Sequence, residues 1–182
     1  MAAFTVIDHT ELGAAASSWD VTSIPSSYDH LLIKASARVD VAGANALSNM
    51  TVFVGDGSLD TGTNYSSTWL VNYSGTVESV GTGTGSAGSL YHKVNNATST
   101  ADTFTSFSIW IPNYANTTNY KQFLTATALE GASTTAYYYA NILRADLWTS
   151  TAAIDEIQLL SAVGSSNFVQ YSTFTLYGVT GA

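Results

Sequence analysis

Short stretches in which apolar and polar residues alternate recur along the chain, and helical periodicity is nearly absent. The clearest alternation runs over residues 28–40. One face of this stretch carries Leu31, Ile33, Ala35, Ala37 and Val39. The opposite face carries His30, Leu32, Lys34, Ser36 and Arg38. Because successive side chains of a strand point to opposite faces, this pattern predicts a half-buried antiparallel strand with one wet or partner-facing side.

Similar stretches predict further strands, separated by clusters of Gly, Ser, Asn and Thr that are typical of turns. The predicted strands cover residues 4–9, 19–24, 49–55, 76–80, 90–94, 104–111, 120–130, 135–147, 154–162 and 167–179. Residues 65–73 are apolar enough to be ordered but show no firm period. About eight to ten antiparallel strands at this spacing are typical of a sandwich or barrel. No linker divides the chain, so we expect one all-β domain, a single antiparallel β-sandwich, over residues 1–182.

The last predicted strand, residues 167–179, is apolar on both faces. One face carries Val169, Tyr171, Thr173, Thr175, Tyr177 and Val179. The other carries Phe168, Gln170, Ser172, Phe174, Leu176 and Gly178. A strand of this kind is usually covered on both sides. We therefore expect it inside a sheet, with one face on the core and the other covered by its own chain or by another subunit.

The chain carries little charge. Charged residues make up 10% of its 182 residues, against roughly 25% in an average globular protein, and the net charge is −8. The fixed cations are Lys34, Arg38, Lys93, Lys121 and Arg144. Nucleic acids and anionic membranes are bound by clustered Lys and Arg, so we expect neither as a partner.

Two further features of the composition concern the compartment. The chain has no cysteine, which excludes disulfides and thiolate metal sites. No apolar run reaches the roughly 20 residues of a spanning helix. The first residues, 1–8, lack the basic region of a secretory signal, so we expect synthesis in a cytoplasm.

Residues 83–88 match the dinucleotide-binding pattern G-x-G-x-x-G. That motif binds phosphate only where it follows a strand and opens a helix. No helix follows here, so the pattern predicts a flexible hairpin loop.

Residues 56–60 place Asp56, Ser58 and Asp60 at alternate positions, as in a calcium-binding loop. The later bidentate Glu and the flanking helices of an EF-hand are missing. We interpret this stretch as a polar loop that uses Asp and Gly for its turns, and a bound cation stays open as the alternative.

The histidines are His9, His30 and His92, and no pair has the spacing of a zinc site. The G-x-S-x-G sequence of a nucleophile elbow is also missing. A Ser-His-Asp site assembled in space is recognised by geometry, so the sequence leaves it open. We expect a protein that is not an enzyme, with no cofactor, no metal and no catalytic residue.

Aromatic residues are abundant, with four Trp and eleven Tyr. Exposed Tyr and Trp side chains anchor interfaces or stack on sugar rings, because each has an apolar body and a polar tip. We favour self-association over glycan contact. The five N-x-[ST] triplets are interpreted as chance products of an Asn-, Ser- and Thr-rich chain, since no signal directs it to a secretory lumen.

The order of turns and strands resembles a group of small virion structural proteins of tailed bacteriophages. The resemblance rests on residues 147–159, 164–178, 24–31 and 60–65, and so spans most of the chain. It implies a jelly-roll-like all-β fold and a homo-oligomer, with trimers favoured. The loop over residues 56–64 is longer than the resemblance implies.

The same resemblance implies a place in the virion, after synthesis in the bacterial host cytoplasm. The first expected role is a capsid decoration or cement protein that stabilises the shell by passive packing against the major capsid protein or other virion proteins. The alternative is a tail-fibre, tail-tip or head-fibre module that binds host-surface glycans. We also expect the face with Lys34 and Arg38 to meet an acidic partner surface.

Overall fold

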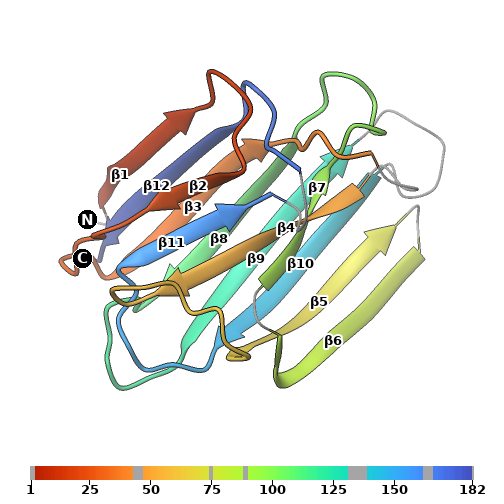
Figure 1. The fold of residues 1–182 in the computed structure, drawn as a ribbon. Coiled ribbons are helices and arrows are strands. Elements are labelled where there is room, and N and C mark those ends of the chain that lie inside the picture. The colour runs from red at the N-terminus through yellow and green to blue at the C-terminus, as the bar shows by residue number, and fades with distance from the viewer. Residues whose placement is uncertain are drawn as a thin grey trace.

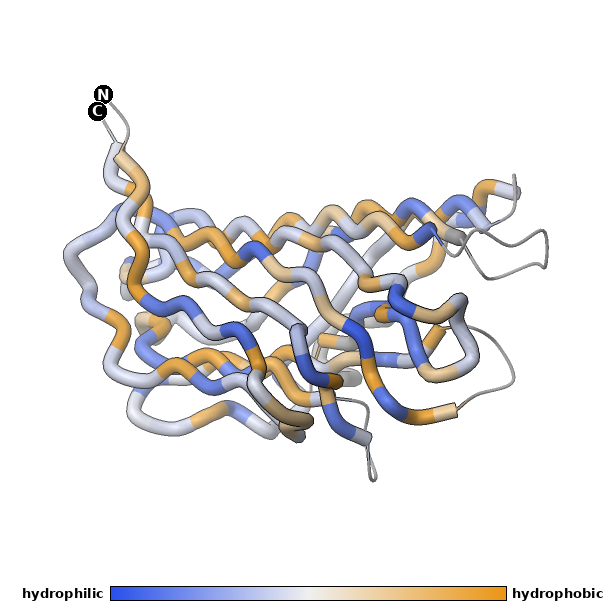
Figure 2. Tube along the Cα trace, turned by 90° about the horizontal axis from the view of Figure 1, so that it is seen from above, coloured by the Kyte–Doolittle hydropathy of each residue, from blue (hydrophilic) through white to orange (hydrophobic). Residues whose placement is uncertain are grey.

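The computed structural model describes residues 3–42, 47–73, 76–87, 90–130, 139–161 and 166–181. These residues form two antiparallel sheets that pack face to face (Figures 1 and 2). The twelve strands of the described chain are β1 (Ala3–Glu11), β2 (Ser18–Val21), β3 (His30–Ala37), β4 (Leu47–Gly55), β5 (Tyr65–Tyr73), β6 (Thr76–Ala87), β7 (Leu90–Asn95), β8 (Thr105–Pro112), β9 (Lys121–Glu130), β10 (Tyr139–Trp148), β11 (Glu156–Leu160) and β12 (Thr173–Thr180). The prediction of an antiparallel β-sandwich is confirmed, with more strands than expected. Within the described ranges, no helix is long and apolar enough to cross a membrane.

The strand order is that of a jelly roll with an extension. The larger sheet has the order β1-β12-β3-β8-β9-β10-β5-β6, and the smaller sheet has the order β2-β11-β4-β7. The first four strands of the larger sheet and the four strands of the smaller one are connected back and forth between the layers, as in two interleaved four-stranded sheets.

The extension consists of two hairpins inserted between jelly-roll strands. β5 and β6 lie between β4 and β7 in the chain, and β9 and β10 lie between β8 and β11. Both hairpins join the larger sheet beyond β8, in the order β9-β10-β5-β6. The larger sheet therefore reaches well beyond the smaller one on this side (Figure 1).

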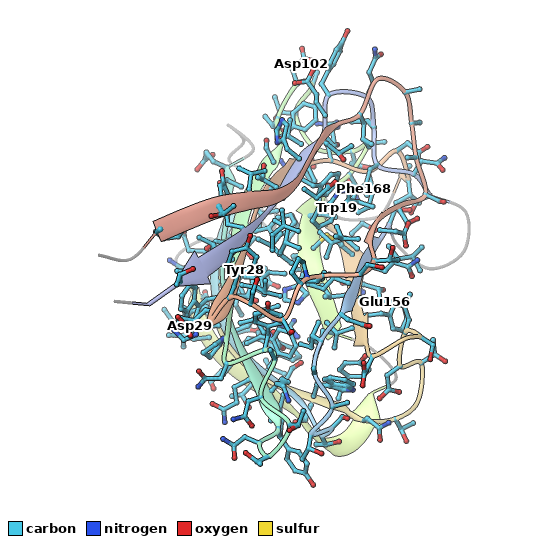
Figure 3. The ribbon with its side chains drawn as sticks, turned by 90° about the vertical axis from the view of Figure 1, so that its left-hand side faces the viewer. Trp19, Tyr28, Asp29, Asp102, Glu156 and Phe168 are labelled. Atoms are coloured by element: carbon cyan, nitrogen blue, oxygen red, sulfur yellow. The ribbon has the colours of Figure 1, made fainter. Side chains whose placement is uncertain are left out.

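The main apolar core lies between the two layers. Trp19 of β2 stacks on Phe174 of β12 with ring centroids 5.4 Å apart, and Phe168 meets Phe174 edge-on at 5.0 Å. Figure 3 shows Trp19 and Phe168 between the layers. A second, smaller cluster consists of Val71, Leu129, Ala140 and Ile142. It belongs to the inner face of the extension, where the inserted strands carry their own apolar residues.

Two strands show a clear alternation of buried and less buried residues, and both lie where the sequence predicts a strand. In β3, Leu31, Ile33, Ala35 and Ala37 are buried, and their neighbours are half-buried or exposed. In β9, every second residue from Lys121 onward is buried. The remaining predicted strands are present with shifted ends, which is the usual uncertainty of boundaries read from periodicity. Residues 135–138 and 162 of two predicted strands lie outside the described residues.

The closing strand is shorter and less covered than predicted. β12 begins only at Thr173, because Tyr171 has a left-handed backbone with φ of 70° and ends the extended run. β12 lies between β1 and β3, as a strand inside a sheet should. Its inner side chains Phe174 and Leu176 are fully buried, while Thr175 and Tyr177 on the outer face are only half-buried. The described part of the chain thus covers the outer face of β12 only partly, and cover by another subunit stays a prediction.

The glycine-rich stretch is also corrected. Residues 83–87 belong to β6, which pairs with β5: Thr82 lies opposite Ser67 and, after a register shift, Ala87 lies opposite Tyr65. The predicted flexible loop is therefore wrong for these residues, and Gly88 lies outside the described residues. Gly has a low strand propensity, so the pairing partner overrides the local sequence.

Two other glycines are required by close packing. A Cβ at Gly55 would lie 1.9 Å from the carbonyl oxygen of Ser58, because the chain turns back on itself directly after β4. A Cβ at Gly178 would lie 2.4 Å from the ring of Tyr28. Tyr28 thus covers β12 at a position where any side chain would displace it.

Candidate binding surfaces

The outer face of the larger sheet is the first candidate surface. One row of paired residues crosses all eight strands, and it consists of Val6, Tyr177, Leu32, Trp110, Leu124, Ala145, Thr68 and Gly81. No member of this row is charged, and each is half-buried or exposed. A solvated sheet face normally carries polar residues, so this row is unusually apolar.

A second row of paired residues on the same face differs between its two ends: it is polar on the jelly-roll strands and apolar on the inserted strands β10 and β5. It consists of His9, Thr175, Lys34, Ser108, Ala126, Leu143, Leu70 and Ser79. The leucines are neighbours on β5 and β10, and Leu70 is 49% and Leu143 51% exposed. Val77 on β6 is 63% exposed. Large apolar side chains therefore gather on the inserted hairpins.

A groove of about 530 Å³ lies in the middle of this outer face. Its floor is formed by the small side chains of Ser106, Ser108, Ala126 and Ala128. One wall is formed by the large apolar residues Leu70, Val77 and Leu143, and Lys34 lies on the side of the jelly-roll strands. Small residues on β8 and β9 beside large residues on β5, β6 and β10 thus produce the hollow.

Arg38 does not share the outer face with Lys34 in the way the alternation predicts. Its guanidinium donates hydrogen bonds to the carbonyl oxygens of Ser99, Thr100 and Thr103, at 2.7–3.1 Å. Burial lowers the pKa of Arg38 below its ordinary value, and the nearby Asp102 carboxylate partly opposes this. Arg38 thus holds a loop of its own chain, and the predicted pair of cations facing a partner is reduced to Lys34.

A polar cluster inside the sandwich is the second feature. Arg144 of β10 donates hydrogen bonds from Nε and Nη2 to Asp146 Oδ1 at 3.2 and 2.9 Å, and from Nη2 to Ser67 Oγ at 2.8 Å. His92 of β7 approaches from the smaller sheet, with Nε2 3.7 Å from Asp146 Oδ2. The side chains of His92 and Asp146 are 1% and 0% exposed. The cluster therefore fills the interior beneath β7, between the two apolar clusters.

The chemistry of this cluster follows from its burial. Burial lowers the pKa of His92 from 6.5 to about 4; the Asp146 carboxylate opposes this effect and Arg144 adds to it. His92 is therefore neutral near pH 7. Among the described residues, neither its ring nitrogens nor Asp146 Oδ2 has a hydrogen-bond partner. Ser67 bonds to Arg144 rather than to His92, so the arrangement lacks the serine–histidine contact of a nucleophilic site.

A cleft opens at the edge of the sandwich beside this cluster, and we call it the inter-sheet cleft. Its volume is about 220 Å³, and it is lined by Asn49, Trp69, Tyr73, Lys93, Ile142 and Arg144. Trp69 and Tyr73 belong to β5, and the Arg144 guanidinium carbon lies 4.7 Å from the centre of the Trp69 ring. Lys93 Nζ donates a hydrogen bond to Asn49 Oδ1 at 2.7 Å. Burial lowers the pKa of Lys93, and the positive charge of Arg144 lowers it further.

In the loop over residues 56–64, Asp60 makes its hydrogen bonds within its own chain. Asp60 Oδ1 accepts a hydrogen bond from the Gly62 amide, and Oδ2 accepts from Asn64 Nδ2 and from Trp148 Nε1. Burial raises the pKa of Asp60, but these hydrogen bonds outweigh it and hold the pKa below its ordinary value. In the described part of the chain, no group of three or more His, Asp or Glu side chains is placed to hold a metal ion. The interpretation as a polar loop fits these contacts.

The other two histidines lie apart from the cluster. His9 Nδ1 is 2.8 Å from Thr175 Oγ1 on the outer face. His30 Nδ1 accepts a hydrogen bond from the Asn113 amide, and its ring lies 4.9 Å from that of Trp110. Among the described residues, His92 is thus the one histidine that is paired with a carboxylate, that of Asp146. Sequence reasoning missed this contact because β7 and β10 lie in different sheets and show no common periodic signal.

The chain matches no family model, and searches of curated proteins and of solved structures also give no match.

Proposed function

We propose that this chain is a structural protein of a bacteriophage virion, and that it decorates and stabilises the capsid by packing its outer sheet face against neighbouring capsid proteins. The observation that carries the proposal is the uncharged row across all eight strands, with exposed Leu70 and Leu143 beside it. The virion context comes from the resemblance in sequence. The surface supplies the physical means of assembly.

The dimensions of the face suit a protein–protein interface. Eight strands about 4.8 Å apart give a width of about 34 Å. A stable interface covers roughly 800 Å² on each partner, which a face of this width supplies over about seven residues of strand length. Large exposed apolar patches on soluble proteins mark interaction sites. The face is therefore wide enough and apolar enough to be one contact surface.

The hollow shape favours a partner other than a second copy placed face to face. Two identical grooves floored by Ser106, Ser108, Ala126 and Ala128 would leave a gap between them. Packing at an interface core matches the density of protein interiors, so such a gap removes contacts. A convex ridge of a capsid protein fills the groove, with its acidic groups beside Lys34.

The mechanism is passive. A protein that binds the assembled shell but not its separate subunits stabilises the assembled form by mass action. Burying one leucine side chain contributes roughly 1.5–3 kcal/mol. Leu70 and Leu143 together thus supply a large part of the binding free energy.

The test is a pair of substitutions on purified protein and on particles. Leu70→Lys with Leu143→Lys should lower particle occupancy by about tenfold or more, since 1.4 kcal/mol corresponds to a factor of ten. Tyr120→Lys is the control, because Tyr120 is 56% exposed but lies outside the rows of the outer face. Unchanged occupancy of the double variant would contradict the proposal, provided its thermal unfolding matches that of the wild type.

Particles without the protein separate this role from the alternative fibre-type role. A cement protein predicts particles that break under heat or low salt but still adsorb to host cells. A glycan-binding fibre module predicts sturdy particles that fail to adsorb. The expected trimer is a separate proposal, and light scattering on the purified chain tests it.

A further inference from the structure

The inter-sheet cleft concentrates positive charge in a chain that has very little of it. Of the five Lys and Arg residues, Lys93 and Arg144 both line this one cleft. Two others serve the chain's own loops: Arg38 binds three loop carbonyls, and Lys121 Nζ donates to the carbonyl oxygens of Asn119 and Thr151. Among the residues that the structure describes, no acidic side chain lines the cleft. Two of the five cations of the chain therefore lie together at this one cleft.

The electrostatic balance of the cleft is incomplete. Asp146 lies behind Arg144 and offsets one positive charge. Lys93 donates a hydrogen bond to the neutral amide of Asn49. This bond uses one of the three N–H donors of the Lys93 ammonium group. Burial and the charge of Arg144 both disfavour the protonated form of Lys93. An anion placed between Lys93 and Arg144 offsets this cost, because an opposite charge within about 4–6 Å favours the charged form.

The walls of the cleft are flat and partly apolar. Trp69 and Tyr73 are four residues apart on β5 and so point to the same face of the strand. Arg144 lies over the Trp69 ring at 4.7 Å, so the guanidinium and the indole form one continuous wall. Aromatic side chains of this kind pack against the face of a ring and hydrogen-bond with their polar tips. Asn49 adds an amide at the entrance.

We propose that the inter-sheet cleft binds a small ring-bearing carboxylate, such as an acidic monosaccharide. The carboxylate lies between Lys93 Nζ and the Arg144 guanidinium, and the ring packs against Trp69 and Tyr73. The volume of about 220 Å³ is below the roughly 300–1,000 Å³ of drug-sized sites, which limits the ligand to about one ring. This proposal does not rest on the proposed capsid role.

The experiment is a titration of the intact chain followed by NMR, with the Trp69 indole N–H as the reporter. Glucuronate, glucose and benzoate are the probes, because they separate carboxylate from ring and sugar ring from aromatic ring. Lys93→Gln removes the charge while keeping a polar chain of similar length. Thr22→Glu is the control, since Thr22 is exposed between β2 and β3 and the change alters the net charge by the same amount.

The expected result is that glucuronate, benzoate or both shift the Trp69 signal, and that glucose does so at least about tenfold more weakly. Which acid binds better identifies the kind of ring. Lys93→Gln should weaken binding by about tenfold or more, the effect of 1.4 kcal/mol. Thr22→Glu should bind like the wild type, and added salt should weaken binding.

Three results would overturn the proposal. One is that neither glucuronate nor benzoate shifts the Trp69 signal, even at the highest concentration at which each acid dissolves. Another is that glucose binds as well as glucuronate. The third is full affinity in a folded Lys93→Gln variant, with folding checked by thermal unfolding. The two proposals fail separately, because Lys93→Gln should leave particle occupancy unchanged and the Leu70→Lys, Leu143→Lys variant should leave ligand binding unchanged.

Discussion

The indole Nε1 of Trp148 donates a hydrogen bond to Asp60 Oδ2 across 2.7 Å. Trp148 is the last residue of β10, and Asp60 lies in the connection between β4 and β5. This bond ties the connection between the two sheets to the end of an inserted hairpin. Because Trp148 is 2% exposed, water is a poor substitute partner for its indole.

Replacing Asp60 should therefore destabilise the fold. Asp60→Ala leaves the buried Trp148 donor unpaired, which costs about 1–3 kcal/mol of unfolding free energy. Urea denaturation measures the change. Asp56→Ala, on the exposed part of the same loop, is the matched control and should change stability by less than about 0.5 kcal/mol. Equal effects of the two substitutions would show that the Trp148 bond contributes nothing.

Gly178→Ala should destabilise through a collision with Tyr28. The new Cβ would lie 2.4 Å from the ring atoms next to its attachment point, which cannot swing away without moving the whole side chain. Overpacking of this kind costs about 1–3 kcal/mol. Gly13→Ala, where nothing lies within 4 Å of the new Cβ, is the control.

A double variant identifies the cause of the Gly178 effect. In a Tyr28→Ala background the clash is gone, so Gly178→Ala should cost much less there than in the wild type. Residues in contact show such coupling, whereas independent sites are additive. Additive losses in thermal unfolding would assign the effect to the backbone of β12 instead.

Arg144→Met should be strongly destabilising, because it leaves the fully buried Asp146 carboxylate without its cation. Removing one partner of a buried ion pair costs about 3–5 kcal/mol. The double variant Arg144→Met, Asp146→Leu should recover most of this loss, since apolar replacements of similar volume are often neutral. Denaturant midpoints of the two variants give the comparison, and a double variant less stable than the single one would refute the explanation.

His92 should make the fold sensitive to mild acid. Its folded pKa of about 4 lies below the ordinary 6.5, so the unfolded chain binds the proton more readily between these values. Stability is therefore fully present above pH 6.5 and falls as the pH drops towards 4. The loss is on the order of 3 kcal/mol, since each pKa unit is worth about 1.4 kcal/mol.

The pH effect is measured by chemical denaturation of wild type and His92→Gln at several pH values. The difference in pH dependence between the two isolates His92 from the carboxylates that also titrate in acid. His9→Gln, at an exposed histidine, is the control for the substitution itself. Identical profiles for wild type and His92→Gln would contradict the assignment.

The sequence alone was sufficient for the elements whose two faces differ. The stretch that became β3 alternates cleanly in sequence, because one face is buried and the other is not. β9 alternates in burial but not in sequence, since Lys121 and Thr125 are buried and Leu124 is exposed. The glycine-rich residues 83–87 gave no such signal, because Gly has a low strand propensity, yet they lie in β6 where its pairing with β5 passes through a register shift. The same limit explains Tyr171, whose left-handed backbone ends a run of residues that otherwise favour strands.

The candidate sites were harder to predict than the strands. The outer face could be anticipated in part, because Trp110 and Lys34 fall on the polar-facing side of their strands. The inter-sheet cleft could not, since Lys93, Trp69 and Arg144 come from three strands whose pairing is unknown before the fold is. The prediction that Arg38 faces a partner failed for a related reason. Strand alternation does not reveal that a loop of the same chain folds over the Arg38 side chain.

The strand order also constrains how the chain folds. β1 lies at the edge of the larger sheet and pairs with β12, and β2 lies at the edge of the smaller sheet and pairs with β11. In the described part of the chain, these two strands therefore have no strand partner until the last segments are made, whereas β3 pairs with β8 before β12 joins its other side. The inserted hairpins and β8 pair with their sequence neighbours instead. Local pairings form faster than distant ones. The extension should therefore assemble first during synthesis, and the jelly roll itself should close late, slowly and with its early strands open to aggregation until β12 arrives.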